Sequence, residues 1–142
     1  MVSNIKSSIG KWYQEGVITG QKAVDMFVRY GGLSRQEATE KVYTWDFIKK
    51  HPECEGISYS AIENYETFCE KTGMSAKVFY DAWKYNYSAK SDVDASGKAI
   101  SGSKKTKVLR YINGLNLSYA QKDSLYYAFG WSQSTINEAP WH

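Results

Sequence analysis

The residues with the clearest potential for metal chemistry lie in the short segment from Asp92 to Gly97. Asp92, Asp94 and Ser96 place oxygen donors at alternate positions before Gly97, as in the first half of an EF-hand calcium loop. The twelfth position of such a loop carries a carboxylate that binds calcium with both oxygens, and here it is Ser103. We therefore interpret the segment as a solvated turn, with Asp92, Asp94 and Ser96 as weak calcium candidates.

Groups that could act as catalytic acids, bases or nucleophiles are few. The chain has two histidines, His51 and His142, and two cysteines, Cys54 and Cys69. Cys54 follows His51 by three positions, but no third group orients this pair, and a zinc site built around it would lack a fourth ligand. A glycine-rich phosphate loop after a strand is also missing. The sequence predicts a protein that is not an enzyme and uses no metal or cofactor.

One cluster of basic residues stands out, comprising Lys104, Lys105, Lys107 and Arg110. Cations at the start of a helix oppose the helix dipole, so a binding role towards an anionic partner would explain their position. The net charge of +3, however, is well below the patterned excess of a dedicated DNA-binding domain. The cluster is a candidate for partner contact, and nucleic acid is the less favoured partner.

The segment from Ser60 to Tyr87 has the spacing of a helix-turn-helix motif. A recognition helix offers Arg, Asn, Gln or Lys to base edges in its first turns. The second helix here begins with the mainly apolar segment Ala76–Asp81, which includes an early acidic residue. Packing in the protein core is therefore the favoured interpretation of this helix.

Length and composition are those of a soluble globular protein. The 142 residues are enough for one domain, and the hydrophobic fraction of 42% is too high for a disordered chain. The aromatic fraction of 15% is high, and Tyr and Trp are common at protein interfaces as well as in cores. We expect no secretory leader, because the first ten residues are polar, and no membrane span. Two cysteines make no disulfide framework, which favours a reducing compartment.

Helical periodicity and capping signals recur along the whole chain, and no alternating strand pattern interrupts them. We therefore predict an all-α fold, a compact bundle of about seven short helices. Three corners between helices share a pattern in which glycine ends one helix, an apolar residue follows and serine caps the next. These corners are Gly32-Leu33-Ser34, Gly73-Met74-Ser75 and the longer Gly114-Leu115-Asn116-Leu117-Ser118.

The predicted organisation has a five-helix body at residues 1–88, a loop at 89–102 and a C-terminal helical hairpin with a tryptophan-containing tail at 103–142, all within one compact domain. Tyr126, Trp131 and Trp141 in this last part are further candidates for partner contact. Two tryptophans are unusual in a frayed terminus. Either the tail docks onto the protein's own helices, or it stays exposed as an anchor for a partner.

A family resemblance covers most of the chain and is strongest over residues 92–142. The chain resembles a segment near the ends of long tail tape-measure-like virion proteins encoded by prophages of Gram-positive bacteria. The motifs that carry this resemblance are Asp94-x-x-Gly97-Lys98-Ala99-Ile100-Ser101-Gly102-Ser103-Lys104-Lys105, Lys107-Val108-Leu109, Tyr111-Ile112-Asn113, Leu117-Ser118, Gln121-Lys122, Leu125-Tyr126 and Ala139-Pro140-Trp141. Upstream, Gly16-x-Ile18-Thr19, Gly31-Gly32-Leu33-Ser34, Glu37-Ala38 and Trp45 add to it.

The resemblance implies a phage-derived protein-binding module, associated with the virion or its tail, with no catalytic motif. A phage-encoded inhibitor of host defence, of the anti-CRISPR type and acting on a host nuclease complex, is the first alternative. A nucleic-acid-binding module is the second. The expected location is accordingly the host bacterial cytoplasm or the virion. Whether the chain stands alone or is part of a longer protein stays open.

Overall fold

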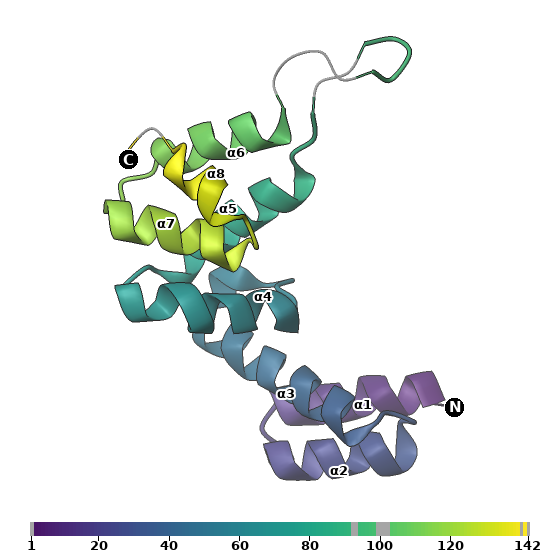
Figure 1. Ribbon diagram of the computed structural model, residues 1–142. Helices are drawn as coiled ribbons and strands as arrows, with labels where there is room; N and C mark the ends of the chain where they lie inside the picture. Colours follow the sequence, from purple (N-terminus) through teal and green to yellow (C-terminus); the bar gives the residue numbers. More distant parts are fainter. Residues whose placement is uncertain (1, 92–93, 99–102, 140, 142) are drawn as a thin grey trace. The chain divides into compact units, whose positions relative to one another are not determined.

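The computed structural model describes residues 2–91, 94–98, 103–139 and 141, and these residues are 71% helical with no strand among them. The all-α prediction is therefore confirmed. The elements, in chain order, are α1 (Val2–Gln14), α2 (Gly20–Tyr30), α3 (Arg35–Lys50), the 3-10 turn η1 (Pro52–Cys54), α4 (Tyr59–Asn64), the π turn η2 (Tyr65–Cys69), the 3-10 turn η3 (Glu70–Thr72), α5 (Ala76–Ser88), α6 (Lys104–Asn113), α7 (Tyr119–Ala128) and α8 (Gln133–Asn137) (Figure 1). None of the helices in the described part is both long and apolar enough to cross a membrane.

The chain divides into two compact units, unit 1 at Met1–Tyr59 and unit 2 at Ser60–His142. This boundary differs from the one suggested by the sequence, which separated residues 1–88 from residues 103–142. The reason is that the C-terminal helices pack on residues before the loop. The Gln121 side-chain amide donates a hydrogen bond of 3.0 Å to the Thr72 carbonyl, and the rings of Trp83 and Phe129 lie 5.9 Å apart. The segments on either side of the loop therefore share one core.

Unit 1 is built from α1, α2 and α3, with α2 packed against both of the others. Ile9, Ala23 and Phe27 are completely buried in its core. Thr19 caps the start of α2, and Ser34 opens α3 with a capping box in which Glu37 accepts from the Ser34 backbone. The buried face therefore follows the helical spacing of apolar residues in the sequence.

Unit 2 has an aromatic core. Phe79 of α5 lies between Tyr65 of η2, at 5.1 Å, and Phe129 after α7, at 6.4 Å between ring centroids. The hydroxyl of the buried Tyr65 donates to the Met74 carbonyl at 2.6 Å, which ties the π turn to the corner before α5. In Figure 1, α6, α7 and α8 gather beside α5.

The predicted glycine–serine corners are present at the ends of α2, η3 and α6. Gly32 and Gly73 have φ values of 75° and 83°, which glycine adopts without the steric penalty of a Cβ atom. Ser34, Ser75 and Ser118 each accept a hydrogen bond from the first turn of the following helix. These short connections keep helices that follow one another in the sequence close together.

A further corner of this type was missed in the sequence and adds an eighth helix. Gly130 has a φ of 79°, and the Trp131 backbone N–H donates to the Tyr126 carbonyl at 3.0 Å. Ser132 then caps α8 by accepting from Thr135. The segment interpreted as a tail thus contains a capped helix, for which Gly130-Trp131-Ser132 was the signal.

Candidate functional site

The segment with calcium-loop character forms a self-contained turn in its described part. The Asp94 Oδ1 atom accepts hydrogen bonds from the Ser96 N–H at 2.9 Å, the Ser96 hydroxyl at 2.6 Å and the Lys98 N–H at 3.0 Å. These bonds, the one from the Ser96 side chain above all, lower the pKa of Asp94. Asp92 lies outside the described residues. Because the Asp94 carboxylate already accepts hydrogen bonds within its own turn, calcium binding remains a weak prediction.

The basic cluster lies along α6 and is partly engaged within unit 2. Lys105 forms an ion pair with Glu138, and the Lys107 ammonium donates to the Lys90 carbonyl at 2.8 Å. The backbone N–H of Lys104 donates to the Ser91 hydroxyl at 3.2 Å. Arg110 is exposed. Lys105 and Lys107 therefore join α6 to the segments after α8 and before α6, and the cluster stays a candidate for partner contact through its exposed side chains.

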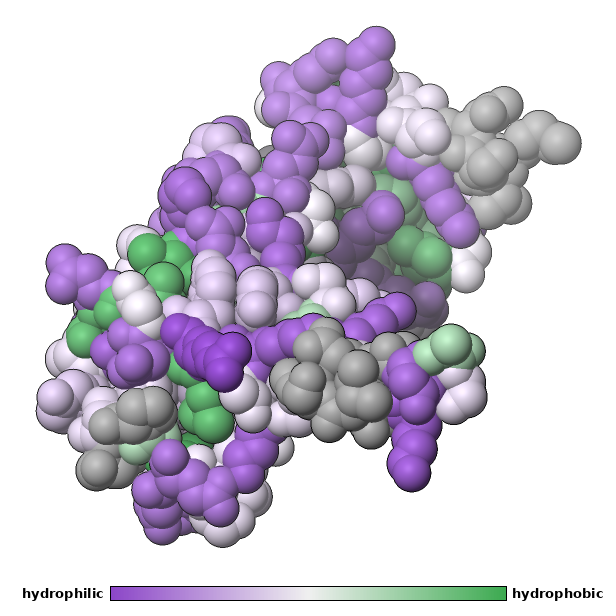
Figure 2. Space-filling view, turned by 90° about the horizontal axis from the view of Figure 1, so that it is seen from above, coloured by the Kyte–Doolittle hydropathy of each residue, from purple (hydrophilic) through white to green (hydrophobic). Residues whose placement is uncertain are grey.

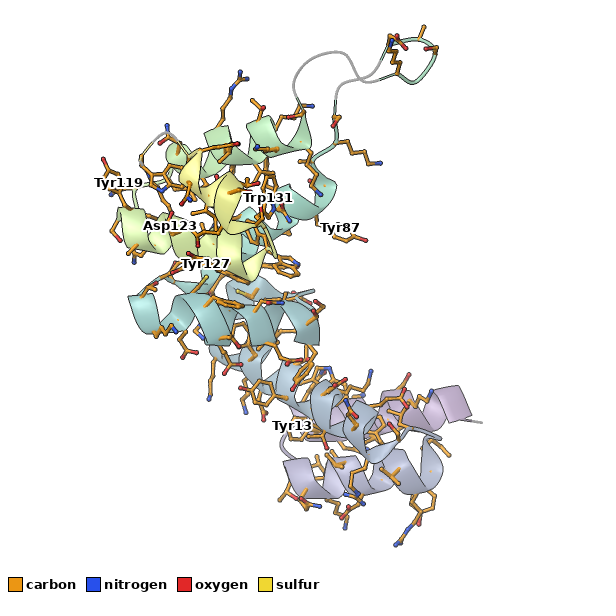
Figure 3. The ribbon with its side chains drawn as sticks, viewed as in Figure 1. Tyr13, Tyr87, Tyr119, Asp123, Tyr127 and Trp131 are labelled. Carbon is orange, nitrogen blue, oxygen red and sulfur yellow. The ribbon has the colours of Figure 1, made fainter. Side chains whose placement is uncertain are left out.

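The aromatic candidates of the C-terminal part lie in or against the core of unit 2. Tyr126 is completely buried, and Trp141 is 8% exposed and stacked on it with an angle of 9° between the rings. The Trp141 indole N–H donates to Asp123 at 2.9 Å, and that of the partly buried Trp131 donates to Asn86 at 3.3 Å. Of the two alternatives for the tail, the structure shows docking onto the protein's own helices. Figure 3 labels Asp123 and Trp131 in this region.

The helix-turn-helix spacing of residues 60–87 also corresponds to core packing. Phe79, Tyr80 and Ala82 of α5 are buried. The exposed side of the helix carries Asp81, whose pKa is lowered by the hydrogen bond from Lys77. A carboxylate held on the exposed side disfavours contact with a phosphate backbone.

The cysteines are buried, and no group of three or more His, Cys, Asp or Glu side chains in the described part could hold a metal ion. Burial raises the pKa of the Cys69 thiol to about 12, so almost no thiolate exists at neutral pH. The ring of His51 lies 4.7 Å from that of Phe47, and its Nδ1 atom lies 3.6 Å from a Glu53 carboxylate oxygen. These contacts do not build a nucleophile and base pair.

Unit 1 contains a hollow that the sequence did not predict. It has a volume of ≈ 500 Å³ and lies between the C-terminal half of α1 and that of α3. We call it the apolar hollow. Its lining residues are Tyr13, Gln14, Gly16, Ile18, Trp45, Asp46, Ile48, Lys49 and Glu55.

Trp45 of α3 is held in place as a wall of this hollow. Its ring stacks on Tyr13 at 5.8 Å and lies 5.7 Å from Phe27. A Cβ atom at Gly10 of α1 would come within 2.9 Å of the Trp45 ring, so glycine is needed for the close approach of the two helices. The indole is therefore fixed while part of its surface remains accessible.

Tyr13 forms the facing wall and is tied to α3. Its hydroxyl donates a hydrogen bond to the Asp46 carboxylate. Burial, followed by this bond and the Asp46 charge, raises the pKa of Tyr13 to about 12. The phenol stays protonated at neutral pH and cannot serve as a base there, so the pair positions the walls and has no catalytic geometry.

Exposed hydrophobic side chains also occur on α1 and in the turn after it, next in sequence to residues of the apolar hollow. Trp12 is 39% exposed and Val17 is 66% exposed. Trp12 follows the buried Ile9 by three positions in α1, yet its side chain lies outside the core. On the face drawn in Figure 2, hydrophilic side chains predominate and hydrophobic ones show in small separate areas.

Searches of protein-family models, curated proteins and solved structures gave no match to the chain. The function proposed below therefore rests on the geometry of unit 1.

Proposed function

We propose that the chain is a non-enzymatic, phage-derived protein-binding module that belongs to the virion or its tail and docks its partner in the apolar hollow. The observation that carries the proposal is the pair of fixed aromatic walls, Tyr13 and Trp45, with Ile18 and Ile48 beside them. Rigid aromatic side chains that remain accessible are typical anchors of protein interfaces.

The hollow is large enough for an apolar side chain and its neighbours from a partner. Small-molecule sites of similar volume carry converging polar groups that fix a ligand's orientation. Here Tyr13 and Asp46 are bonded to each other, and the other polar residues of the lining are Gln14, Lys49 and Glu55. Apolar walls accompanied by charged side chains are typical of protein interfaces, so we take a protein segment as the occupant. The resemblance to prophage tail proteins supports a virion partner.

Site-specific photocrosslinking tests the proposal. Gln14 lines the hollow and is exposed, so p-benzoylphenylalanine can replace it without loss of a core contact. Tyr87 of α5 is 82% exposed and projects from unit 2 in Figure 3, which makes it the matched control position. The protein is produced in prophage-bearing cells during induction and illuminated there.

We expect crosslinks to one virion protein from position 14 and none to that protein from position 87. A crosslink from position 14 to a host defence nuclease would replace the virion function by the inhibitor function. Crosslinks to nucleic acid, or to no protein from position 14, would contradict the proposed function.

A further inference from the structure

A second hollow of unit 1, of ≈ 330 Å³, adjoins the apolar hollow and has the opposite character. The two share Gln14 and the ring of Trp45. We call it the lysine hollow. Its lining residues are Lys6, Ser7, Gly10, Lys11, Gln14, Lys41 and Trp45.

Three lysines from two helices line the lysine hollow, and no carboxylate residue is among its lining residues. Lys6 and Lys11 come from α1, whereas Lys41 comes from α3. The Glu37 carboxylate is close enough for Lys6 to contribute to its lowered pKa, as the smallest of the causes. Lys11 and Lys41 have no carboxylate within ion-pair distance among the described residues. Like charges gathered in this way repel one another, and an anionic ligand would relieve the repulsion.

Lys41 links the two hollows. Its ammonium lies 5.2 Å from the centroid of the Trp45 ring and 6.0 Å from that of Phe27. This cation–π contact holds the charge over the Trp45 ring, which also forms a wall of the apolar hollow. A ligand that covers Trp45 would therefore meet an apolar surface on one side and positive charge on the other.

We infer that the partner segment is acidic, with an apolar side chain in the apolar hollow and one or more Asp or Glu side chains in the lysine hollow. This inference rests on the proposed function, because it specifies the partner of the same site. Because the two hollows share the Trp45 wall, one short segment of the partner can place a side chain in each. On a helical segment, these would be residues three or four positions apart, which lie about 5–6 Å from each other.

A nucleic acid fits the two hollows less well than an acidic peptide. Asp46 and Glu55 contribute two carboxylates to the apolar hollow against the single ammonium of Lys49, and this excess would repel a phosphate backbone that continued from the lysine hollow. Neither hollow contains an arginine, the side chain best suited to bidentate phosphate contacts. An isolated pair of carboxylates beside an apolar anchor avoids this repulsion.

Selection from a displayed library of random 12-residue peptides on the purified full chain tests the inference. Three baits are compared: the unchanged chain, the variant K6Q/K11Q/K41Q, and the variant K22Q/K50Q/K90Q. The control variant K22Q/K50Q/K90Q changes the net charge by the same amount as K6Q/K11Q/K41Q, and its three lysines lie outside both hollows. A labelled single-stranded DNA 12-mer is titrated against the same baits by fluorescence anisotropy.

We expect peptides selected on the unchanged chain and on K22Q/K50Q/K90Q to combine an apolar residue with Asp or Glu within four positions. Their affinity for K6Q/K11Q/K41Q should be about tenfold lower. Apolar peptides without acidic enrichment would overturn this inference and leave the proposed function standing. No peptide selected above background would contradict both, and an equal loss in both lysine variants would reduce the effect to net charge. Tighter binding of the DNA 12-mer than of any peptide would overturn the inference in favour of nucleic acid.

Discussion

The two units differ in the surroundings of their tryptophans, although exposed tyrosines such as Tyr87 and Tyr119 occur in unit 2 as well. Unit 2 directs its tryptophans inwards: Trp141 stacks on the buried Tyr126, and Trp131 bonds to Asn86. Unit 1 instead leaves part of Trp45 accessible and rests it against Gly10. A high aromatic content therefore marks a core in one region and a candidate interface in the other. What separates the two is whether neighbouring side chains cover the ring.

The largest effect is expected from Trp141→Ala in unit 2. This substitution removes a ring that is 8% exposed, its stacking on Tyr126 and its hydrogen bond to Asp123. We expect the free energy of unfolding of unit 2 to fall by about 3 kcal/mol, as for other buried aromatic truncations. Urea denaturation followed by amide hydrogen exchange in α7 measures it. The control is Tyr119→Ala, because Tyr119 is 64% exposed and its loss should cost less than about 1 kcal/mol. Equal losses for the two variants would show that the tail is not docked.

The next effect concerns the close approach in unit 1. In Gly10→Ala the added Cβ would overlap the Trp45 ring, which is held between Tyr13 and Phe27. Overpacking of this kind costs about 1–3 kcal/mol, against a gain of about 1 kcal/mol in helix propensity. We therefore expect a net loss of about 1 kcal/mol in thermal or urea unfolding. In Gly114→Ala the nearest atom is 3.6 Å away, so that variant should be neutral or stabilised. A stabilised Gly10→Ala would mean that Trp45 moves freely.

A smaller effect is expected from pH on the Tyr13–Asp46 pair. The fold raises the pKa of Tyr13 from 10.0 to about 12, so it favours the protonated phenol. The contribution to stability is fully present below pH 10 and is lost as the pH rises through about 12. Asp46→Asn should lower the pKa of Tyr13 only in part, because burial is the largest cause. NMR titration of ¹³Cζ-labelled tyrosines measures this. A Tyr13 pKa of 10 in the unchanged chain would contradict the bonded geometry.

The smallest effect is expected from calcium. Asp94 already accepts three hydrogen bonds from its own turn, and Ser103 stands where a closing carboxylate would be needed. Calorimetric titration should give a dissociation constant weaker than about 10 μM, outside the range of calcium sensors. Tighter binding that is lost in Asp94→Asn would show that the segment is a calcium site.

The sequence was most informative about local structure. Glycine and serine at fixed offsets predicted the corners at Gly32 and Gly73, because a positive φ and a side-chain cap depend on adjacent residues alone. The same offset at Gly130 was missed because the segment after it was interpreted as a tail. Those signals identified the class of fold and most of its helices.

The candidate site depends instead on residues far apart in the chain. Gly10 and Trp45 belong to different helices, and nothing in either helix indicates that one faces the other. Trp12 and Trp45 both follow the apolar spacing of a helix, yet Trp12 lines neither hollow and Trp45 lines both. The lysine hollow was missed for a similar reason: Lys6, Lys11 and Lys41 form no run in the sequence, whereas the visible run lies on α6, where Lys105 and Lys107 have partners in unit 2.

The five tryptophans provide the most direct test that unit 1 is the binding surface. Their indole N–H signals in a ¹H–¹⁵N NMR spectrum report on Trp12 and Trp45 in unit 1 and on Trp83, Trp131 and Trp141 in unit 2. The full chain is titrated with one of the peptides selected on it. We expect the Trp45 signal to shift most, Trp12 to shift less and the three signals of unit 2 to stay in place. A shift centred on Trp131 or Trp141, with Trp45 unmoved, would contradict the account.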